Sequence, residues 1–252
     1  MKLNSVLKGG MEMVEVRNLT KKFKDVTAVN DMSFTVREGE IVGLLGENGA
    51  GKTTTLRMIA TMIKPTGGDA EVNGHNIISE PYQVRGEIGI LFGGEVGLYD
   101  RLTAKENIKY FGELNGMNKS ELDERMVKLS EMLDMDEYIN RRVGKFSRGM
   151  KQKVAIARSI VHNPKVMLFD EPSTGLDVTS SIIVQEFILK CKEQGKAIIF
   201  SSHSMKEVER LCDRVVIINK GKLVEDSTLD GLKSKYNDDD LERIFIKLVG
   251  DK

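Results

Sequence analysis

Short apolar runs separated by polar residues recur in the first third and in the last third of the chain. Each run has the length of a β-strand, and the runs cover residues 14–19, 32–36, 41–45, 70–73, 88–92, 166–170, 197–201 and a stretch from Val215. The late runs alternate with segments of helical period, one at about residues 179–194 and one that Ser204 and Glu207 would cap. Alternating strands and helices predict a parallel sheet covered by helices.

The middle of the chain, at about residues 102–162, has a helical period instead. Thr103 and Glu106 form a capping-box pattern at its start. Apolar side chains farther along fall on one helix face, namely Leu122, Met126, Leu129 and Leu133. Another helix is expected from residue 52 to about residue 63, just before Pro65. The whole pattern predicts an α/β core, interrupted by a helical subdomain and edged by the N-terminal strands.

Charge and cysteine content exclude several classes of protein. Lys and Arg together number 38, as do Asp and Glu, so no global basic field would attract nucleic acid or an anionic membrane. The two cysteines, Cys191 and Cys212, are too few for a disulfide framework and form no CxxC motif. The longest apolar runs are strand-length, which predicts a cytoplasmic protein whose membrane role would depend on a partner.

The first twelve residues show no clear pattern. We expect residues 1–12 to be a disordered or non-native extension, with translation naturally starting at Met11 or Met13. Residues 13–252 then form a single domain.

A glycine-rich loop follows the expected strand 41–45 and precedes a helix. It fits the pattern GxxxxGK[ST], with Gly46, Glu47, Asn48, Gly49, Ala50, Gly51, Lys52 and Thr53. Glycines let backbone N–H groups point at phosphates, and the following helix N-terminus adds partial positive charge. Lys52 would reach the β- and γ-phosphates, and Thr53 would contact Mg²⁺. Alone, this loop predicts nucleotide binding of an unspecified kind.

Two further strands end in residues that suit phosphate chemistry. Asp170 and Glu171 end the run 166–171. Acidic residues at this position can simply mark the point where a buried strand reaches the surface. Beside a glycine-rich loop of this kind, however, the first acid supports Mg²⁺, usually through water, and the second suits a general base. His203 follows the run 197–201; it could be a structural polar residue, but ligands bind beyond the carboxyl ends of such strands, which favours a γ-phosphate contact.

The segment 146–152, Phe-Ser-Arg-Gly-Met-Lys-Gln, precedes a predicted helix with Ser147 as a candidate N-cap. It resembles the signature motif of ABC ATPases, and its spacing to Asp170 is like that of the family. Residues 173–177 resemble the D-loop, His203 matches the switch histidine, and Phe23 matches the aromatic residue that stacks on adenine. On these motifs, which stand in the family's order, the chain is identified as a member of the ATP-binding subunits of ABC transporters.

The resemblance implies a P-loop NTPase core of ABC ATPase type, with an antiparallel β subdomain and an inserted α-helical subdomain. It also implies a head-to-tail dimer closing over two ATP molecules with Mg²⁺. Each site would take residues 46–54, including Thr54, and the side chains of Asp170, Glu171 and His203 from one protomer. The other protomer would add Ser147, Gly149 and Asp177, and Arg148 would either approach the opposing nucleotide or face solvent.

The chain departs from the family pattern after the strand 88–92. The family usually carries a Gln there, which contacts Mg²⁺ and links the nucleotide to the membrane subunit, whereas this chain has Gly94 followed by Glu95. We expect water to replace the Gln at Mg²⁺, and the loop backbone with Glu95 to carry the coupling.

Several segments, such as 92–95, 97–103 and 140–143, look like those of the NatA type, the ATP-binding subunits of bacterial sodium-extrusion ABC transporters. This resemblance implies a subunit on the cytoplasmic face of the membrane that powers Na⁺ export through a separate permease. Export of a drug, a peptide antibiotic or a lipid is the alternative. A soluble ABC ATPase of translation or DNA maintenance is disfavoured, because the chain holds one cassette and no long heptad coiled coil.

Overall fold

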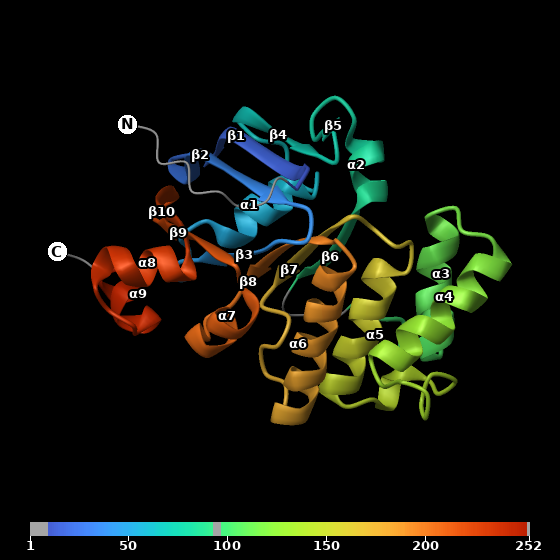
Figure 1. Cartoon of the computed structure of the whole chain (residues 1–252). Coiled ribbons are helices and arrows are strands. Elements are labelled where there is room, and N and C mark those ends of the chain that lie inside the picture. The colour runs from blue at the N-terminus through green and yellow to red at the C-terminus, as the bar shows by residue number, and fades with distance from the viewer. Residues whose placement is uncertain (1–9, 93–96, 251–252) are drawn as a thin grey trace.

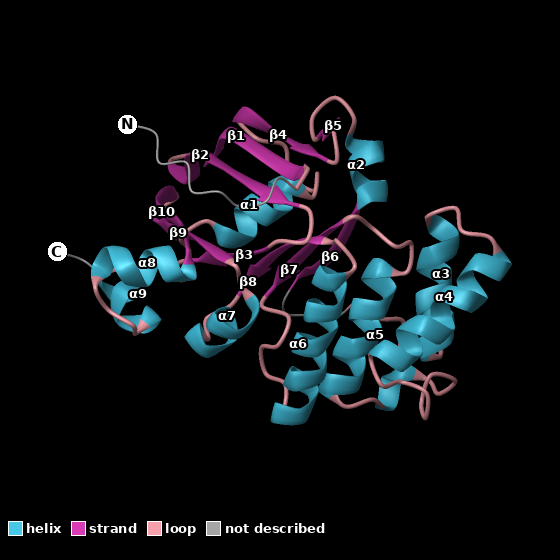
Figure 2. Ribbon diagram, viewed as in Figure 1, coloured by secondary structure: helices cyan, strands magenta, loops and turns pink. Residues whose placement is uncertain are grey.

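The computed structural model describes residues 10–92 and 97–250, which form two β-sheets and a set of helices (Figure 1). The smaller sheet has the strand order β2-β1-β4-β5 and the larger has the order β10-β9-β3-β8-β7-β6. The small sheet covers one face of the large sheet, and most of the helices cover the other face (Figure 2). Among the described residues, no helix is both long enough and apolar enough to cross a lipid bilayer.

The large sheet is parallel except at one edge. Strands β6 (Ile88–Phe92), β7 (Val166–Asp170), β8 (Ala197–Ser201), β3 (Ile41–Leu45) and β9 (Arg214–Asn219) run in one direction, and β10 (Lys222–Thr228) returns antiparallel to β9. Every residue of β3, β7 and β8 is buried. In the register of the sheet, Ser201 lies opposite both Asp170 and Leu44, so the carboxyl ends of three strands meet at one edge.

The central strands supply side chains to two cores at once. In β8, Ile198 and Phe200 pack with the helices, whereas Ala197 and Ile199 pack toward the small sheet. Successive side chains of a strand point to opposite faces, so a strand buried on both faces is apolar at every position. This geometry explains why these strands read as continuous apolar runs.

The small sheet consists of β1 (Glu12–Phe23), β2 (Val26–Arg37), β4 (Gly67–Val72) and β5 (His75–Asn76) and is antiparallel throughout. Helix α1 (Lys52–Ile59) lies between the two sheets and buries Leu56 and Ile59 there, and α2 (Pro81–Glu87) leads from the small sheet into β6 (Figure 1). The loop before α1 is therefore held between the small sheet and the large sheet.

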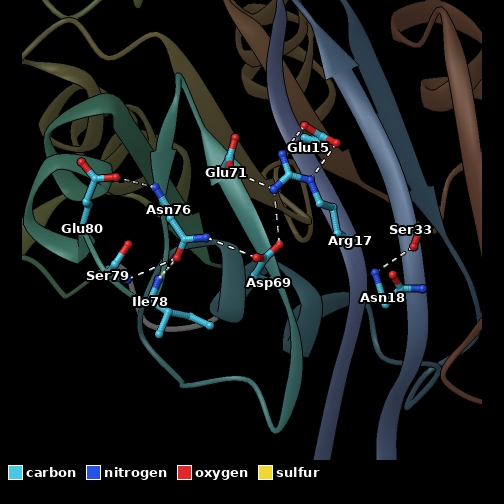
Figure 3. A network of polar contacts seen from close by, with 10 residues as sticks. All are labelled: Glu15, Arg17, Asn18, Ser33, Asp69, Glu71, Asn76, Ile78, Ser79 and Glu80. Atoms are coloured by element: carbon cyan, nitrogen blue, oxygen red, sulfur yellow. Dashed lines mark hydrogen bonds and ion pairs between the residues drawn. The ribbon is translucent and has the colours of Figure 1, made fainter.

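The outer face of the small sheet carries a polar network rather than a core (Figure 3). Arg17 forms ion pairs with Glu15 at 2.6 Å and with Glu71 at 2.8 Å, and Asp69 lies beside it. Asn76 donates a hydrogen bond from Nδ2 to Asp69 at 3.4 Å. The Arg17 side chain is 40% exposed, so solvent screens these charges.

The helical half begins with α3 (Ala104–Leu114) and α4 (Lys119–Met132), which lie farthest from the sheets in Figure 1. A short 3₁₀ turn (Val143–Lys145) leads to α5 (Arg148–Ile160), which packs with α6 (Val178–Glu193) against the large sheet. The chain then forms α7 (Met205–Leu211), α8 (Leu229–Tyr236) and α9 (Leu241–Val249). The capping box of Thr103 and Glu106 is present as predicted, and Asn118 and Glu121 form a second one.

Some predicted boundaries were wrong. The helix after the glycine-rich loop ends at Ile59 rather than near residue 63, because Thr61 adopts a left-handed conformation with φ of 59°. Strand β1 begins at Glu12, and the Met11 carbonyl accepts a hydrogen bond from the Glu38 N–H. The expected extension otherwise lies in residues 1–9, outside the described residues.

Arg214, at the start of β9, joins the two sheets through a buried ion-pair cluster. Its Nε lies 2.8 Å from Glu40 Oε1, its Nη1 pairs with Asp226 on β10, and its Nη2 donates to the Thr35 carbonyl on β2. The side chains of Arg214 and Glu40 are only 13% and 10% exposed. Loss of the guanidinium would leave the buried Glu40 carboxylate without its cationic partner, with only the Arg37 N–H, among the described residues, still donating to it.

We expect Arg214→Ala to lower the free energy of unfolding by about 3 kcal/mol, measured by urea denaturation. Arg17→Ala is the matched control, because Arg17 also contacts several carboxylates but is half exposed. The control should cause a much smaller loss. Equal losses in the two variants would contradict a bridging role for Arg214.

Candidate active site

The glycine-rich loop lies between β3 and α1, at the carboxyl edge of the large sheet. Gly51 immediately precedes α1 with φ of 113°, and a Cβ there would lie 2.5 Å from the Ala28 carbonyl oxygen of β2. Only glycine combines this conformation with so close an approach of two backbones. The motif therefore requires glycine at position 51 because β2 of the small sheet lies directly against the loop there.

Lys52 fills the centre of this loop. Its Nζ donates hydrogen bonds to the Gly46 carbonyl at 2.6 Å and to the Glu47 carbonyl at 3.1 Å. Burial lowers the pKa of Lys52, and the nearby carboxylates of Glu171 and Asp170 act in the opposite direction. The loop therefore presents a desolvated ammonium group beside backbone N–H groups.

Asp170, at the end of β7, accepts a hydrogen bond on each carboxylate oxygen. Thr53 Oγ1 donates to Oδ2 at 2.6 Å, and Ser201 Oγ donates to Oδ1 at 2.5 Å. Asp170 is 6% exposed, so its orientation is set by these two hydroxyls. A hydroxyl and a carboxylate, both hard oxygen donors, fit the small set of protein ligands that Mg²⁺ takes when a nucleotide provides the rest.

Glu171 is held in an uncommon backbone conformation, with φ of 52°. Its N–H donates to both the carbonyl and the hydroxyl of Ser201 at 3.1 Å. Its carboxylate lies 2.6 Å from His203 Nε2 and accepts a hydrogen bond from Thr174 Oγ1 at 3.2 Å. Strain of this kind persists where neighbours over-determine the geometry. Glu171 lines a cavity together with residues of the glycine-rich loop.

These groups together line two small cavities. One, of about 120 Å³, is lined by the loop residues Lys52, Thr53 and Thr54 together with Glu171. The other, of about 220 Å³, is lined by Thr53, Asp170, Glu171 and Arg148. The structure thus brings together the glycine-rich loop, the Asp170–Glu171 pair and His203, as the sequence predicts.

Three of the residues predicted to serve the partner's site, Ser147, Gly149 and Asp177, lie elsewhere, at the N-termini of two helices. Ser147 caps α5 by accepting a hydrogen bond from the Met150 N–H at 3.2 Å. Asp177 caps α6 and accepts from the Ser180 N–H at 2.9 Å, which holds the pKa of its carboxyl below the usual range. Gly149 packs directly on Ser180, since a Cβ on Gly149 would overlap Ser180 Oγ. Ser147, Gly149 and Asp177 line neither of the two cavities.

The remaining predicted residues have separate positions. Phe23 ends β1 with its side chain exposed, and Lys21 Nζ lies 5.0 Å from the centre of its ring. Gly94 and Glu95, the predicted coupling residues, lie outside the described residues.

Sequence reasoning missed Ser201 and Thr174. Ser201 orients Asp170 and anchors the Glu171 N–H, and Thr174 contacts the Glu171 carboxylate. A polar residue at the end of an otherwise apolar strand was the available signal for Ser201. The signal for Thr174 was only its place in the segment 173–177 that resembles the D-loop. Its contact with Glu171 depends on the turn that folds residues 171–176 back on themselves.

The chain matches known proteins over most of its length. The ABC transporter family model matches residues 29–174. The ABC transporter ATP-binding protein NatA of Bacillus subtilis is 50% identical over 242 residues, which cover 94% of this chain and 98% of that protein. The bacitracin transport ATP-binding protein BcrA of Bacillus licheniformis is 37% identical over 225 residues, which cover 88% of this chain and 72% of that protein.

A solved structure supports the same assignment. A dimeric ATP-binding cassette in a post-hydrolysis state, bound to ADP and Pi, superposes with a TM-score of 0.77 at 26% identity, covering 86% of this chain and 98% of that one. The predicted fold class is thereby confirmed. With the family model, the relatives and the arrangement of the loop, Asp170 and Glu171 in agreement, this chain belongs to the ABC transporter family as an ATP-binding, ATP-hydrolysing subunit.

Proposed function

We propose that this ATPase binds ATP with Mg²⁺ in the loop of residues 46–54 and hydrolyses it with Glu171 as the general base. The observation that carries this proposal is the shared cavity of about 120 Å³, which Glu171 lines together with Lys52 and Thr53. A general base must lie near the water that attacks the γ-phosphate, and this cavity lies beside the phosphate loop.

The other side chains have distinct roles in the proposed reaction. Lys52 exchanges its two carbonyl partners for phosphate oxygens, which concentrates positive charge where negative charge develops. Thr53 and Asp170 hold Mg²⁺, which neutralises the phosphate oxygens when bound. His203, 2.6 Å from Glu171, orients the base and contacts the γ-phosphate, and Phe23 offers an exposed ring for the adenine.

A second copy of the chain completes each site. Ser147 is exposed at the N-terminus of α5 and lines neither of the two cavities, which supports a contact with the γ-phosphate held by the partner. Asp177, exposed at the N-terminus of α6, reaches across the dimer seam. ATP binding closes the dimer and hydrolysis opens it, so that a two-state motion becomes available to a partner.

The partner is an integral membrane permease, which places the subunit at the cytoplasmic face of the membrane. Gly94 and Glu95 couple ATP hydrolysis to the permease, because they follow β6, the strand whose end lies at the ATP site. Export of Na⁺ is supported by the segments that resemble the sodium-extrusion type, such as 92–95, 97–103 and 140–143. The chain is also 50% identical, over 94% of its length, to the ABC transporter ATP-binding protein NatA. The likeness to the bacitracin transport protein supports a peptide antibiotic or a drug as the second candidate cargo.

Glu171→Gln should lower the steady-state ATPase rate at least about 100-fold, because the amide cannot accept a proton from water. ATP binding should persist, and a stable ATP-bound dimer should appear in size-exclusion chromatography. Glu186→Gln, an exposed change on α6, is the control and should leave the rate unchanged. A Glu171→Gln protein with wild-type turnover would remove Glu171 from its proposed role.

Ser201→Ala should raise the Mg²⁺ concentration needed for half-maximal ATPase activity by about tenfold, because Asp170 loses one of its two orienting hydrogen bonds. Ser202→Ala is the matched control: it also loses a buried hydrogen bond, to Glu207 at 2.5 Å, but not one to Asp170. Identical Mg²⁺ titrations for the wild type and Ser201→Ala would show that Ser201 has no influence on the metal.

Vesicles containing this chain and its permease should extrude Na⁺ on ATP addition, followed with a sodium-sensitive dye. Gly94→Gln should alter the ratio of ions moved to ATP hydrolysed, because it changes the proposed coupling loop. ATP hydrolysis without sodium movement, accompanied by extrusion of bacitracin, would reject sodium and support the antibiotic.

A further inference from the structure

We propose that Arg148 is a positioning residue that locks the signature helix α5 onto the segment following Glu171 in the same chain. Because Ser147 and Glu171 of one chain would serve different ATP sites of the dimer, this lock couples the two sites. The coupling rests on the proposed function, whereas the lock itself rests on contacts within one chain.

The first turns of α5 contact residues 172–180 at several points. Gln152 Nε2 donates a hydrogen bond to the Pro172 carbonyl at 2.6 Å. A Cβ on Gly149 would overlap Ser180 Oγ, so the helix backbone lies directly on the start of α6. These contacts hold α5 against both ends of the segment 172–180. Arg148 contacts the middle of the segment, at Gly175.

The Arg148 guanidinium lies across the bare face of Gly175. A Cβ added to Gly175 would overlap its Nη1 and Cζ and would lie 2.8 Å from its Nη2. Gly175 has φ of 73° within two consecutive turns, in which Thr174 N–H donates to the Glu171 carbonyl and Leu176 N–H donates to the Ser173 carbonyl. The planar group therefore covers the turn that starts at the proposed general base.

The same guanidinium also faces the catalytic groups. Arg148 lines the cavity of about 220 Å³ together with Thr53, Asp170 and Glu171. Arg148 is exposed, so solvent screens the attraction between its charge and the two carboxylates. The packing on Gly175 therefore carries the contact, and the shared cavity places the side chain beside the proposed general base.

A connection between sites follows from the chain order. Ser147 directly precedes Arg148 and caps the helix that Arg148 anchors. A shift of Ser147, when it meets the γ-phosphate held by the partner, moves the guanidinium and with it the turn of residues 171–176. The turn carries Glu171, which acts on the other ATP. Each nucleotide would therefore adjust the base that attacks the other, with the reciprocity that any coupling requires.

The test is a double-mutant cycle with Arg148→Ala and Gly175→Asn. Asn tolerates the left-handed conformation of Gly175, and its Cβ expels the guanidinium without removing the charge. Each single variant should lower kcat about tenfold and reduce the Hill coefficient for ATP from about two toward about one. The double variant should lose no more than either single variant, because both changes break one contact.

Lys151→Ala is the matched control, since it removes a cation from the same helix whose partner is Asp100 rather than the turn. It should leave kcat and the Hill coefficient unchanged. If Arg148 instead contacts the opposing nucleotide, Arg148→Ala would raise the KM for ATP, Gly175→Asn would not, and the losses would add. Additive losses, or wild-type kinetics in Arg148→Ala, would overturn the proposal.

Amide hydrogen exchange tests the contact between Arg148 and the turn independently of ATPase activity. In the nucleotide-free full-length protein, residues 173–180 should exchange at least about threefold faster in Arg148→Ala than in the wild type or Lys151→Ala. Unchanged exchange would reject the lock whatever the kinetics. Absence of ATPase activity in the wild type would reject the proposed function but not a lock seen by exchange.

Discussion

The site depends on one buried carboxylate that two hydroxyls hold from opposite sides. Asp170 ends β7 and accepts hydrogen bonds from Thr53 on α1 and from Ser201 on β8. At 6% exposure it cannot rely on water, so these bonds decide its orientation. They join the glycine-rich loop to two neighbouring strands, and they make Asp170 the point from which the rest of the site takes its geometry.

The two sheets matter because they confine this site from both sides. The apolar cluster between the sheets surrounds α1, and Arg214 connects β9 with β2 and β10 at the rim of the same layer. The opposite cluster holds α5 and α6 against the large sheet. The loop is therefore positioned by elements that no local sequence rule connects, whereas Ser147 and Asp177, at the N-termini of α5 and α6, are exposed.

The sequence predicted best what depends on local chemistry. Strands 41–45, 88–92, 166–170 and 197–201 agree with the structure to the residue. Three of them are buried at every position and 88–92 at three of its five, so each gives a nearly continuous apolar run that ends where polar residues begin. The caps at Thr103, Ser147 and Ser204 were predictable for the same reason. Strand β10 and helices α8 and α9 were not predicted. β10 buries only Glu225 and α8 only Leu232, so neither shows a clear apolar period, whereas α9 has one and was overlooked. Ser201, Thr174 and the packing of Arg148 on Gly175 depend on distant segments meeting, and the roles of the site residues stay predictions until they are tested.

The contacts of Lys52 have a consequence for how the nucleotide enters. The ammonium group is held by the carbonyls of Gly46 and Glu47, so the loop is wound around its own cation. Ordering of the backbone is then completed during folding, and little conformational entropy remains to be lost when phosphate arrives. Phosphate binding then replaces the two carbonyl partners of Lys52 with phosphate oxygens. The net free energy gained is the difference between the interaction of Lys52 with phosphate and its interaction with the two carbonyls. A site built this way can hold a nucleotide firmly enough to use it and still release the product.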